Sequence, residues 1–104
     1  MLYTGGGDGV VKSWNTESGK CIGEMQGHRA GILDVAASLD DEYVAASSTD
    51  QHKINIYRTK TCNKLLSLTG HSDAVNSLKF NYSRKALISG SSDRTLRTWD
   101  IEKN

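Results

Sequence analysis

Short segments in which apolar and polar residues alternate follow one another along this chain, separated by Gly, Asn, Asp and Ser. Residues 74–80 show the pattern most clearly, with Val75, Leu78 and Phe80 as inward positions and a bulge between them. The same alternation predicts that Ile54 and Ile56 face inward while the polar residues beside them face outward. A period of two residues is typical of strands, so an all-β fold is predicted.

Ten strands are predicted, with no helix longer than one turn. They cover residues 2–6, 9–14, 19–26, 31–37, 43–48, 53–58, 62–69, 74–80, 85–90 and 94–100. The chain has 104 residues, of which ten are glycine and none is proline. This composition suits many short strands joined by tight turns.

The strands repeat in groups. Gly-His occurs at residues 27–28 and 70–71, and each copy precedes an alternating segment, a Ser-rich stretch that ends in Asp, and an aromatic residue. Three copies align at an aspartate and at a closing aromatic residue: Asp8, Asp50 and Asp93, then Trp14, Tyr57 and Trp99. A repeat of about 40–45 residues with Gly-His near its start and Trp-Asp near its end is the signature of a four-stranded propeller blade.

The repeats predict a partial propeller in which one complete blade lies between two incomplete ones. We place a partial blade at 1–26, a complete blade at 27–69 and a partial blade at 70–104. Propellers close with about 4–8 blades. We therefore expect either a fragment of a larger propeller protein or a unit that associates with itself through open blade edges.

In these repeats the chain resembles the WD-repeat family. In that family a histidine, a serine or threonine, the turn aspartate and the tryptophan form a chain of hydrogen bonds within each blade. The resemblance implies this structural relay in the third blade at His71, Ser89, Asp93 and Trp99. The first blade matches it at Thr4, Asp8 and Trp14. Tryptophan only donates, serine donates and accepts, and the carboxylate only accepts. A series of hydrogen bonds through these side chains therefore gives each of them a partner.

The middle blade departs from this pattern. It has His28 and Asp50, but Ala46 replaces the hydroxyl residue and Tyr57 replaces the tryptophan. One extra residue also lies between Asp50 and Tyr57. We expect an incomplete relay here and the least stable of the three blades.

Catalytic and metal chemistry are not predicted. Ser89, His71 and Asp93 are the residue types of a hydrolase triad, but they recur with the repeat, and each occupies a structural position. His28 and His52 are spaced from each other and from His71 in no zinc-binding pattern. Residues 5–9 are glycine-rich but lack the Lys-Ser/Thr of a phosphate loop. We expect no catalytic residue, no metal and no cofactor.

Net charge, hydropathy and cysteine content indicate which kinds of partner and which cellular compartment to expect. A net charge of +1 provides no bulk attraction for nucleic acid. No apolar run approaches the ~18 residues of a membrane span, and residues 1–20 do not read as a signal peptide. Cys21 and Cys62 are expected to be reduced, half-buried thiols, with a disulfide between blades as the alternative. We expect a cytoplasmic protein that neither binds nucleic acid nor inserts into membranes.

The resemblance also places a partner-binding face on the loops that carry the Gly-His turns and the turn aspartates. The candidate residues there are Arg29, Ala30, Gln51, His52, Ser72, Asp73, Ser92 and Arg94. This mixture of Arg, His and Ser suits a protein or peptide partner that carries acidic or phosphorylated groups.

Two stretches resemble one subfamily, the C-terminal propeller of the autophagy-related protein sixteen family. They are residues 30–34 leading to 44–48, and residues 68–72 running to 91–100. That resemblance implies a protein-interaction scaffold that recruits partners in autophagy. The alternative is a non-functional or structural fragment of a larger propeller protein with another scaffold role, in signalling or complex assembly.

Overall fold

The structure, a computed structural model, describes residues 1–26, 28, 31–38, 40–49, 52–81 and 86–101. These residues form ten strands in three antiparallel sheets and no helix, which confirms the all-β prediction. Within this described part, no helix is long and apolar enough to cross a membrane. The predicted strand limits agree with the observed ones to within two residues.

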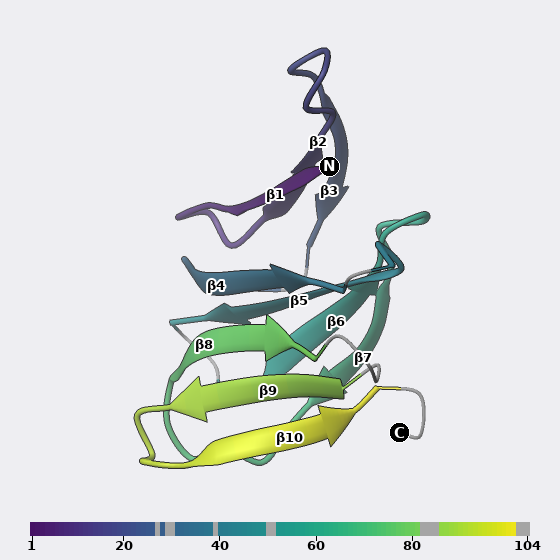
Figure 1. The fold of residues 1–104 in the computed structure, drawn as a ribbon. Helices are drawn as coiled ribbons and strands as arrows, with labels where there is room; N and C mark the ends of the chain where they lie inside the picture. The colour runs from purple at the N-terminus through teal and green to yellow at the C-terminus, as the bar shows by residue number, and fades with distance from the viewer. Residues whose placement is uncertain (27, 29–30, 39, 50–51, 82–85, 102–104) are drawn as a thin grey trace.

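Each sheet follows the chain order, and we call the three sheets blades 1, 2 and 3. Blade 1 contains β1 (Leu2–Gly5), β2 (Val11–Trp14) and β3 (Cys21–Met25). Blade 2 contains β4 (Ile32–Ala37), β5 (Tyr43–Ser48), β6 (Ile54–Arg58) and β7 (Lys64–Leu68). Blade 3 contains β8 (Val75–Phe80), β9 (Ala86–Ser91) and β10 (Leu96–Asp100). Figure 1 shows blade 2 between the other two.

The apolar core lies in two layers between the blades. One layer joins blades 2 and 3 and includes Ile54, Ile56 and Phe80, and the other joins blades 1 and 2 around Tyr57 and Met25. Because blade 2 is covered on both faces, all six residues of β5 are buried. The core is therefore built by stacking, and each blade depends on its neighbour for its stability.

The inward positions predicted for β8 are confirmed. Val75, Leu78 and Phe80 are buried, and the pairing of β8 with β9 shifts between Val75 and Ser77, where the sequence predicts a bulge. This irregularity lets one strand keep its apolar residues on the face that meets blade 2.

The outward position predicted for Asn55 is wrong, because β6 lies between two packed blades and its second face is also covered. Asn55 is fully buried. Its side-chain oxygen accepts a hydrogen bond from Ser67 at 2.8 Å, and its amide donates to the Tyr57 hydroxyl at 3.2 Å. These two bonds offset the cost of burying an amide among apolar side chains.

Backbone contacts also join the blades near their inner strands. The Asp34 carboxylate on β4 accepts a hydrogen bond from the backbone nitrogen of Leu78 on β8 at 2.8 Å. The backbone nitrogen of Ile32 donates to the Gly6 carbonyl at 3.0 Å. The Ile32 side chain also lies so close to Gly5 that a Cβ built there would be 2.3 Å from it. Blade 1 and blade 3 are thus both anchored on β4.

The two cysteines are free thiols. Cys62 is partly buried, as expected, and packs against blade 1, where a Cβ built on Gly23 would lie 2.5 Å from its sulfur. Cys21 is exposed, so its predicted half-burial is wrong. The reason is its position at the start of β3, the outer strand of blade 1, which no further strand of the described chain covers.

Candidate functional site

Blade 3 contains a continuous chain of side-chain hydrogen bonds. The Trp99 indole nitrogen donates to the Ser89 hydroxyl oxygen at 2.8 Å, which lies 2.7 Å from Nε2 of His71. Nδ1 of His71 lies 2.8 Å from the Asp93 carboxylate. Since a carboxylate only accepts, Nδ1 carries the proton, and Nε2 accepts from Ser89. Each donor therefore has one acceptor along the whole chain, and His71 and Ser89 can be buried without an unpaired group.

Asp93 organises the turn between β9 and β10. Its carboxylate also accepts hydrogen bonds from the Ser72 backbone nitrogen at 3.1 Å and from the Thr95 backbone nitrogen at 2.9 Å. A further bond comes from the Thr95 hydroxyl. The hydrogen bond from the Thr95 hydroxyl is the main reason why the pKa of Asp93 lies well below its usual value, and the bond to His71 lowers it further. Partial burial raises the pKa but does not cancel these bonds. The carboxylate is therefore ionised at neutral pH and fixes the shape of the turn.

Arg94 follows Asp93 and has a left-handed backbone, with φ of 70°. The matching residue of blade 1 is Gly9, with φ of 80°, where the absence of a Cβ makes this conformation free of strain. An arginine there costs about 1 kcal/mol. The surrounding hydrogen bonds offset this cost, and they hold the exposed guanidinium side chain on a rigid turn.

The structure brings four of the predicted partner-binding residues to one end of blade 3. Ser72, Asp73, Ser92 and Arg94 are exposed there. The Ser92 backbone nitrogen donates to the Ala74 carbonyl at 2.9 Å and ties the two loops together. His52 is exposed on blade 2. Arg29, Ala30, Asp50 and Gln51 lie outside the described residues.

In blade 2 the histidine has a different partner. Nε2 of His28 lies 3.0 Å from the Ala46 carbonyl oxygen, so this nitrogen carries the proton, the reverse of His71. Tyr57 is buried in the interface with blade 1 and is bonded to Asn55. Sequence reasoning missed this Asn55 network, because no repeat landmark falls on it.

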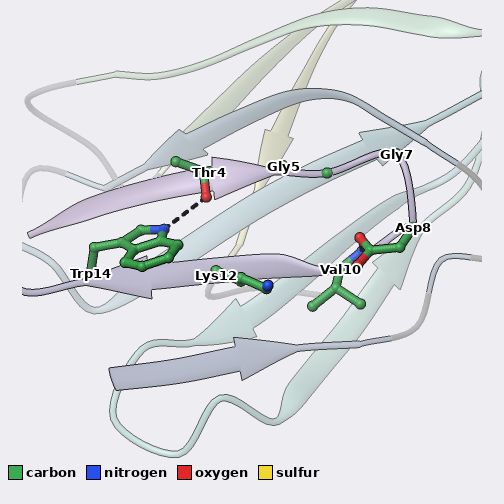
Figure 2. A pocket seen from close by; sticks show the side chains of 8 residues that line it. Thr4, Gly5, Gly7, Asp8, Val10, Lys12 and Trp14 are labelled. Carbon is green, nitrogen blue, oxygen red and sulfur yellow. Dashed lines mark hydrogen bonds between the residues drawn. The ribbon is translucent and has the colours of Figure 1, made fainter. Parts of the chain in front are cut away.

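Blade 1 contains a pocket of about 420 Å³ that sequence reasoning did not predict. Its lining residues all belong to that blade: Thr4, Gly5, Gly6, Gly7, Asp8, Val10, Lys12 and Trp14. Figure 2 shows Trp14 directed at Thr4, to whose hydroxyl oxygen it donates a hydrogen bond at 2.8 Å. The Asp8 carboxylate accepts from the Val10 backbone nitrogen at 3.1 Å. The pocket is therefore lined by fixed polar groups.

The described residues include no group of three or more His, Cys, Asp or Glu side chains arranged to hold a metal ion. The features that they do contain are repeated sheets, a side-chain relay and exposed loops. These features favour binding.

Comparisons with known proteins agree with the repeat pattern. The chain is 34% identical over 103 residues to Autophagy-related protein 16 of Arabidopsis thaliana and 35% identical over 103 residues to Protein tipD of Dictyostelium discoideum. These alignments cover 98% and 99% of this chain but only 20% and 16% of those relatives.

Solved structures of WD repeats are similar as well. "Crystal structure of RRP9 WD40 repeats" and "Structure of U3-55K" each match with a TM-score of 0.92 and 30% identity over 98% of this chain. The match covers 32% and 33% of those chains, respectively. The family described as "WD domain, G-beta repeat" matches residues 19–57 and 62–100. This chain therefore belongs to the WD domain, G-beta repeat family.

Proposed function

We propose that this WD-repeat chain binds an acidic or phosphorylated protein segment through the loops at one end of blade 3. The observation that carries the proposal is Arg94, an exposed arginine on a turn that Asp93 holds rigid in a left-handed conformation. Glycine would adopt this conformation without strain, but this chain has an arginine there. A guanidinium group can bind a carboxylate or a phosphate through two parallel hydrogen bonds.

Hydroxyl groups on the same two loops support this choice of partner. The carboxylate of Asp73 has the opposite sign to Arg94 and accepts a hydrogen bond from the Ala74 backbone nitrogen at 2.7 Å, which holds it on its own loop. Ser72 and Ser92 are exposed beside it and add hydroxyl groups. Arg29 follows the equivalent Gly-His turn of blade 2 in the sequence and is proposed as a second cation on the same face.

The relay of blade 3 is proposed to have a structural role and not a catalytic one. Ser89, His71 and Asp93 do follow the order of a hydrolase triad. The Ser89 side chain is fully buried, however, and its oxygen already accepts the indole hydrogen of Trp99. A substrate carbonyl would have to displace packed core residues to reach this hydroxyl.

The proposed cellular role is that of a scaffold that recruits partners in autophagy. Support comes from the similarity to Autophagy-related protein 16 along almost the whole of this chain. Because the chain spans about a fifth of the length of these relatives or less, the role is proposed for this interaction surface alone.

Fluorescence polarisation with paired synthetic peptides, one with phosphoserine and one with serine, tests the binding surface. Arg94→Glu and Arg29→Glu should each weaken binding of the phosphorylated peptide at least tenfold by charge reversal. Lys60→Glu is the matched control, since its turn is tied to Glu42 at the other end of blade 2. Equal binding by wild type and both arginine variants, with circular dichroism unchanged, would refute the proposed surface.

A pull-down from cell extract with wild type and Arg94→Glu, followed by mass spectrometry, tests the cellular role. Autophagy proteins should be recovered with wild type and lost with the variant. Binding of the phosphorylated peptide without any recovery of autophagy proteins would retain the surface and reject the proposed pathway.

A further inference from the structure

A cavity of about 360 Å³ lies between two turns of blade 2, the one that joins β4 to β5 and the one that joins β6 to β7. Figure 1 shows these two turns side by side. The Thr59 backbone nitrogen donates to the Glu42 carbonyl at 3.1 Å, and the Thr59 hydroxyl donates to the Asp41 carbonyl. The cavity is lined by Asp40, Asp41, Glu42, Arg58, Thr59 and Lys60. Because β5 begins beside this cavity, the cavity lies at the opposite end of blade 2 from the Gly-His loops.

The two walls of the cavity carry opposite charges. Asp41 and Glu42 lie on the turn between β4 and β5, whereas Arg58 and Lys60 lie on the turn between β6 and β7. The Asp40 carboxylate is held in its own turn, where it accepts a hydrogen bond from the Glu42 backbone nitrogen at 3.1 Å. Among the described residues, the Asp41 carboxylate and the Lys60 ammonium form no ion pair with each other. A ligand that carries both an anion and a cation would therefore find a partner for each of its charges.

The turn between β6 and β7 has the same backbone hydrogen bonds as the turn between β2 and β3 of blade 1. The Arg58 nitrogen donates to the Asn63 carbonyl at 3.0 Å, and the Asn15 nitrogen donates to the Lys20 carbonyl at 2.9 Å. Counting from these two bonds places Arg58 at the position of Asn15. Since blade 1 builds the same turn with an uncharged side chain there, the turn does not require a cation at this position.

The side chain of Asn15 caps the turn of blade 1. Its oxygen accepts hydrogen bonds from the backbone nitrogens of Glu17 at 2.8 Å and Ser18 at 3.1 Å. The equivalent nitrogens of blade 2 belong to Lys60 and Thr61, and neither has a hydrogen-bond partner in the described part of the chain. The arginine that replaces the asparagine has no acceptor to offer them. Blade 2 therefore has two unused amides beside a guanidinium group, which is an arrangement that suits an anionic oxygen.

The charges around the cavity favour a carboxylate over a phosphate. The guanidinium carbon of Arg58 lies 5.6 Å from the centre of the Tyr43 ring, and this contact holds the side chain on its turn. A guanidinium can donate two parallel hydrogen bonds to a carboxylate. A phosphate would bring more negative charge toward Asp41 and Glu42, and the lining side chains, two cations and three carboxylates, already carry a net negative charge. The cavity is thus unsuited to the phosphorylated segment proposed for blade 3.

We propose that this cavity binds the carboxyl-terminal residue of a partner protein when that residue is lysine or arginine. Only at such a chain end does one residue carry a carboxylate and a side-chain cation together. The carboxylate binds Arg58 and the amides of Lys60 and Thr61, and the side-chain cation binds Asp41 and Glu42 on the opposite wall. In a free amino acid an α-ammonium group would lie beside Arg58 and be repelled, whereas the α-nitrogen of a peptide is a neutral amide.

Fluorescence polarisation of the 104-residue chain with a labelled peptide tests this site. The probe is a short Gly-Ser peptide that ends in lysine with a free carboxylate and carries the label at its other end. The same peptide with a carboxyamide end should bind at least tenfold more weakly, because the Arg58 guanidinium and the two amides lose their charged acceptor. A probe that ends in norleucine keeps the carboxylate but lacks the cation, and it should also bind more weakly. Equal binding of the lysine acid and its amide would overturn the proposal.

Arg58→Asn is the most informative variant, because it restores the capping side chain of blade 1. It should remain folded, since the new oxygen can bond the amides of Lys60 and Thr61, and it should bind the lysine probe at least tenfold more weakly. Asp41→Asn should also weaken binding about tenfold, and asparagine tolerates the left-handed φ of 60° at this position. Lys20→Glu, at an exposed lysine of the equivalent turn in blade 1, is the matched control and should not change the affinity. An unchanged affinity in Arg58→Asn, with circular dichroism equal to that of wild type, would overturn the proposal.

Competition experiments identify the source of the ligand. Free lysine should not displace the labelled probe at concentrations at which the unlabelled peptide does. Displacement by both at equal concentrations would mean that the cavity takes a free amino acid, and a partner chain end would be rejected. The phosphoserine peptide used for blade 3 should not compete either, and its competition would reject the selection against phosphate. Binding at blade 3 and binding at this cavity can therefore fail independently.

Discussion

Replacing Ser89 with alanine tests whether the relay of blade 3 stabilises this protein. The hydroxyl of Ser89 is the only link between Trp99 and His71 that the hydrogen-bond pattern of the described residues contains. Its removal leaves the indole hydrogen and Nε2 of His71 unpaired, while Nδ1 remains bonded to Asp93. In blade 2, Nε2 of His28 donates its hydrogen to a backbone carbonyl. Nε2 of His71 cannot find a replacement partner in this way, because the ring hydrogen of His71 is on Nδ1, where it is donated to Asp93.

The magnitude follows from the burial of each orphaned group. An unpaired buried group costs about 1–3 kcal/mol. Trp99 is partly exposed and belongs at the lower end, whereas His71, buried to 6% exposure, belongs at the upper end. The sum is about 4 kcal/mol, a large part of the ~5–15 kcal/mol by which domains are stable.

Urea denaturation at pH 7, followed by tryptophan fluorescence and circular dichroism, measures this loss. Ser77→Ala is the matched control, since Ser77 is exposed on β8, and the change there should stay within about 0.5 kcal/mol. The slope of the transition should be the same in both variants. If Ser89→Ala costs no more than Ser77→Ala, the relay does not stabilise the fold and the reasoning is refuted.

Three further predictions concern the turns and the packing between blades. Because folding lowers the pKa of Asp93 from its usual 3.8, the contribution of this carboxylate to stability is complete above pH 3.8 and is lost on acidification. In Asp93→Asn the unfolding free energy should therefore fall less steeply between about pH 5 and 2 than in wild type, and a slope equal to that of wild type would contradict this. Arg94→Gly should raise the unfolding free energy by about 0.5–1 kcal/mol by removing left-handed strain, and a lower melting temperature would count against it. Gly23→Ala should destabilise by about 1–3 kcal/mol because its Cβ would meet the Cys62 sulfur at 2.5 Å, whereas Gly7→Ala, with no atom within 4 Å, should not; equal melting temperatures would refute the close packing.

Much of the fold was predictable because the evidence for it is local. Alternation with a period of two identified the strands, and the bulge in β8 follows from the spacing of Val75 and Leu78. The residue types of the relay also follow from the repeat, because the matching of donors and acceptors needs no knowledge of the surroundings. Asn55 shows where such reasoning fails, since alternation describes one strand and does not reveal that a blade covers each of its faces.

The candidate sites depended more on tertiary structure. The left-handed backbone of Arg94 is set by the hydrogen bonds around Asp93, and its sequence signal is indirect, since it lies in the glycine at the matching position of blade 1, Gly9. The pocket of blade 1 has recognisable residue types, but its walls come from the pairing of β1 with β2 and from the turn between them.

The strands, the repeat and the residues of each blade can be predicted from the amino-acid order, because they are set by the two-residue period of a strand and by repeated side-chain chemistry. Which faces are covered and which polar groups meet across blades depends on how the three sheets pack. The bond between Asp34 and Leu78 joins residues 44 positions apart, and stacking buries both faces of β5 and β6. Packing between sheets couples distant segments, and so it leaves no periodic mark in the sequence of any one of them.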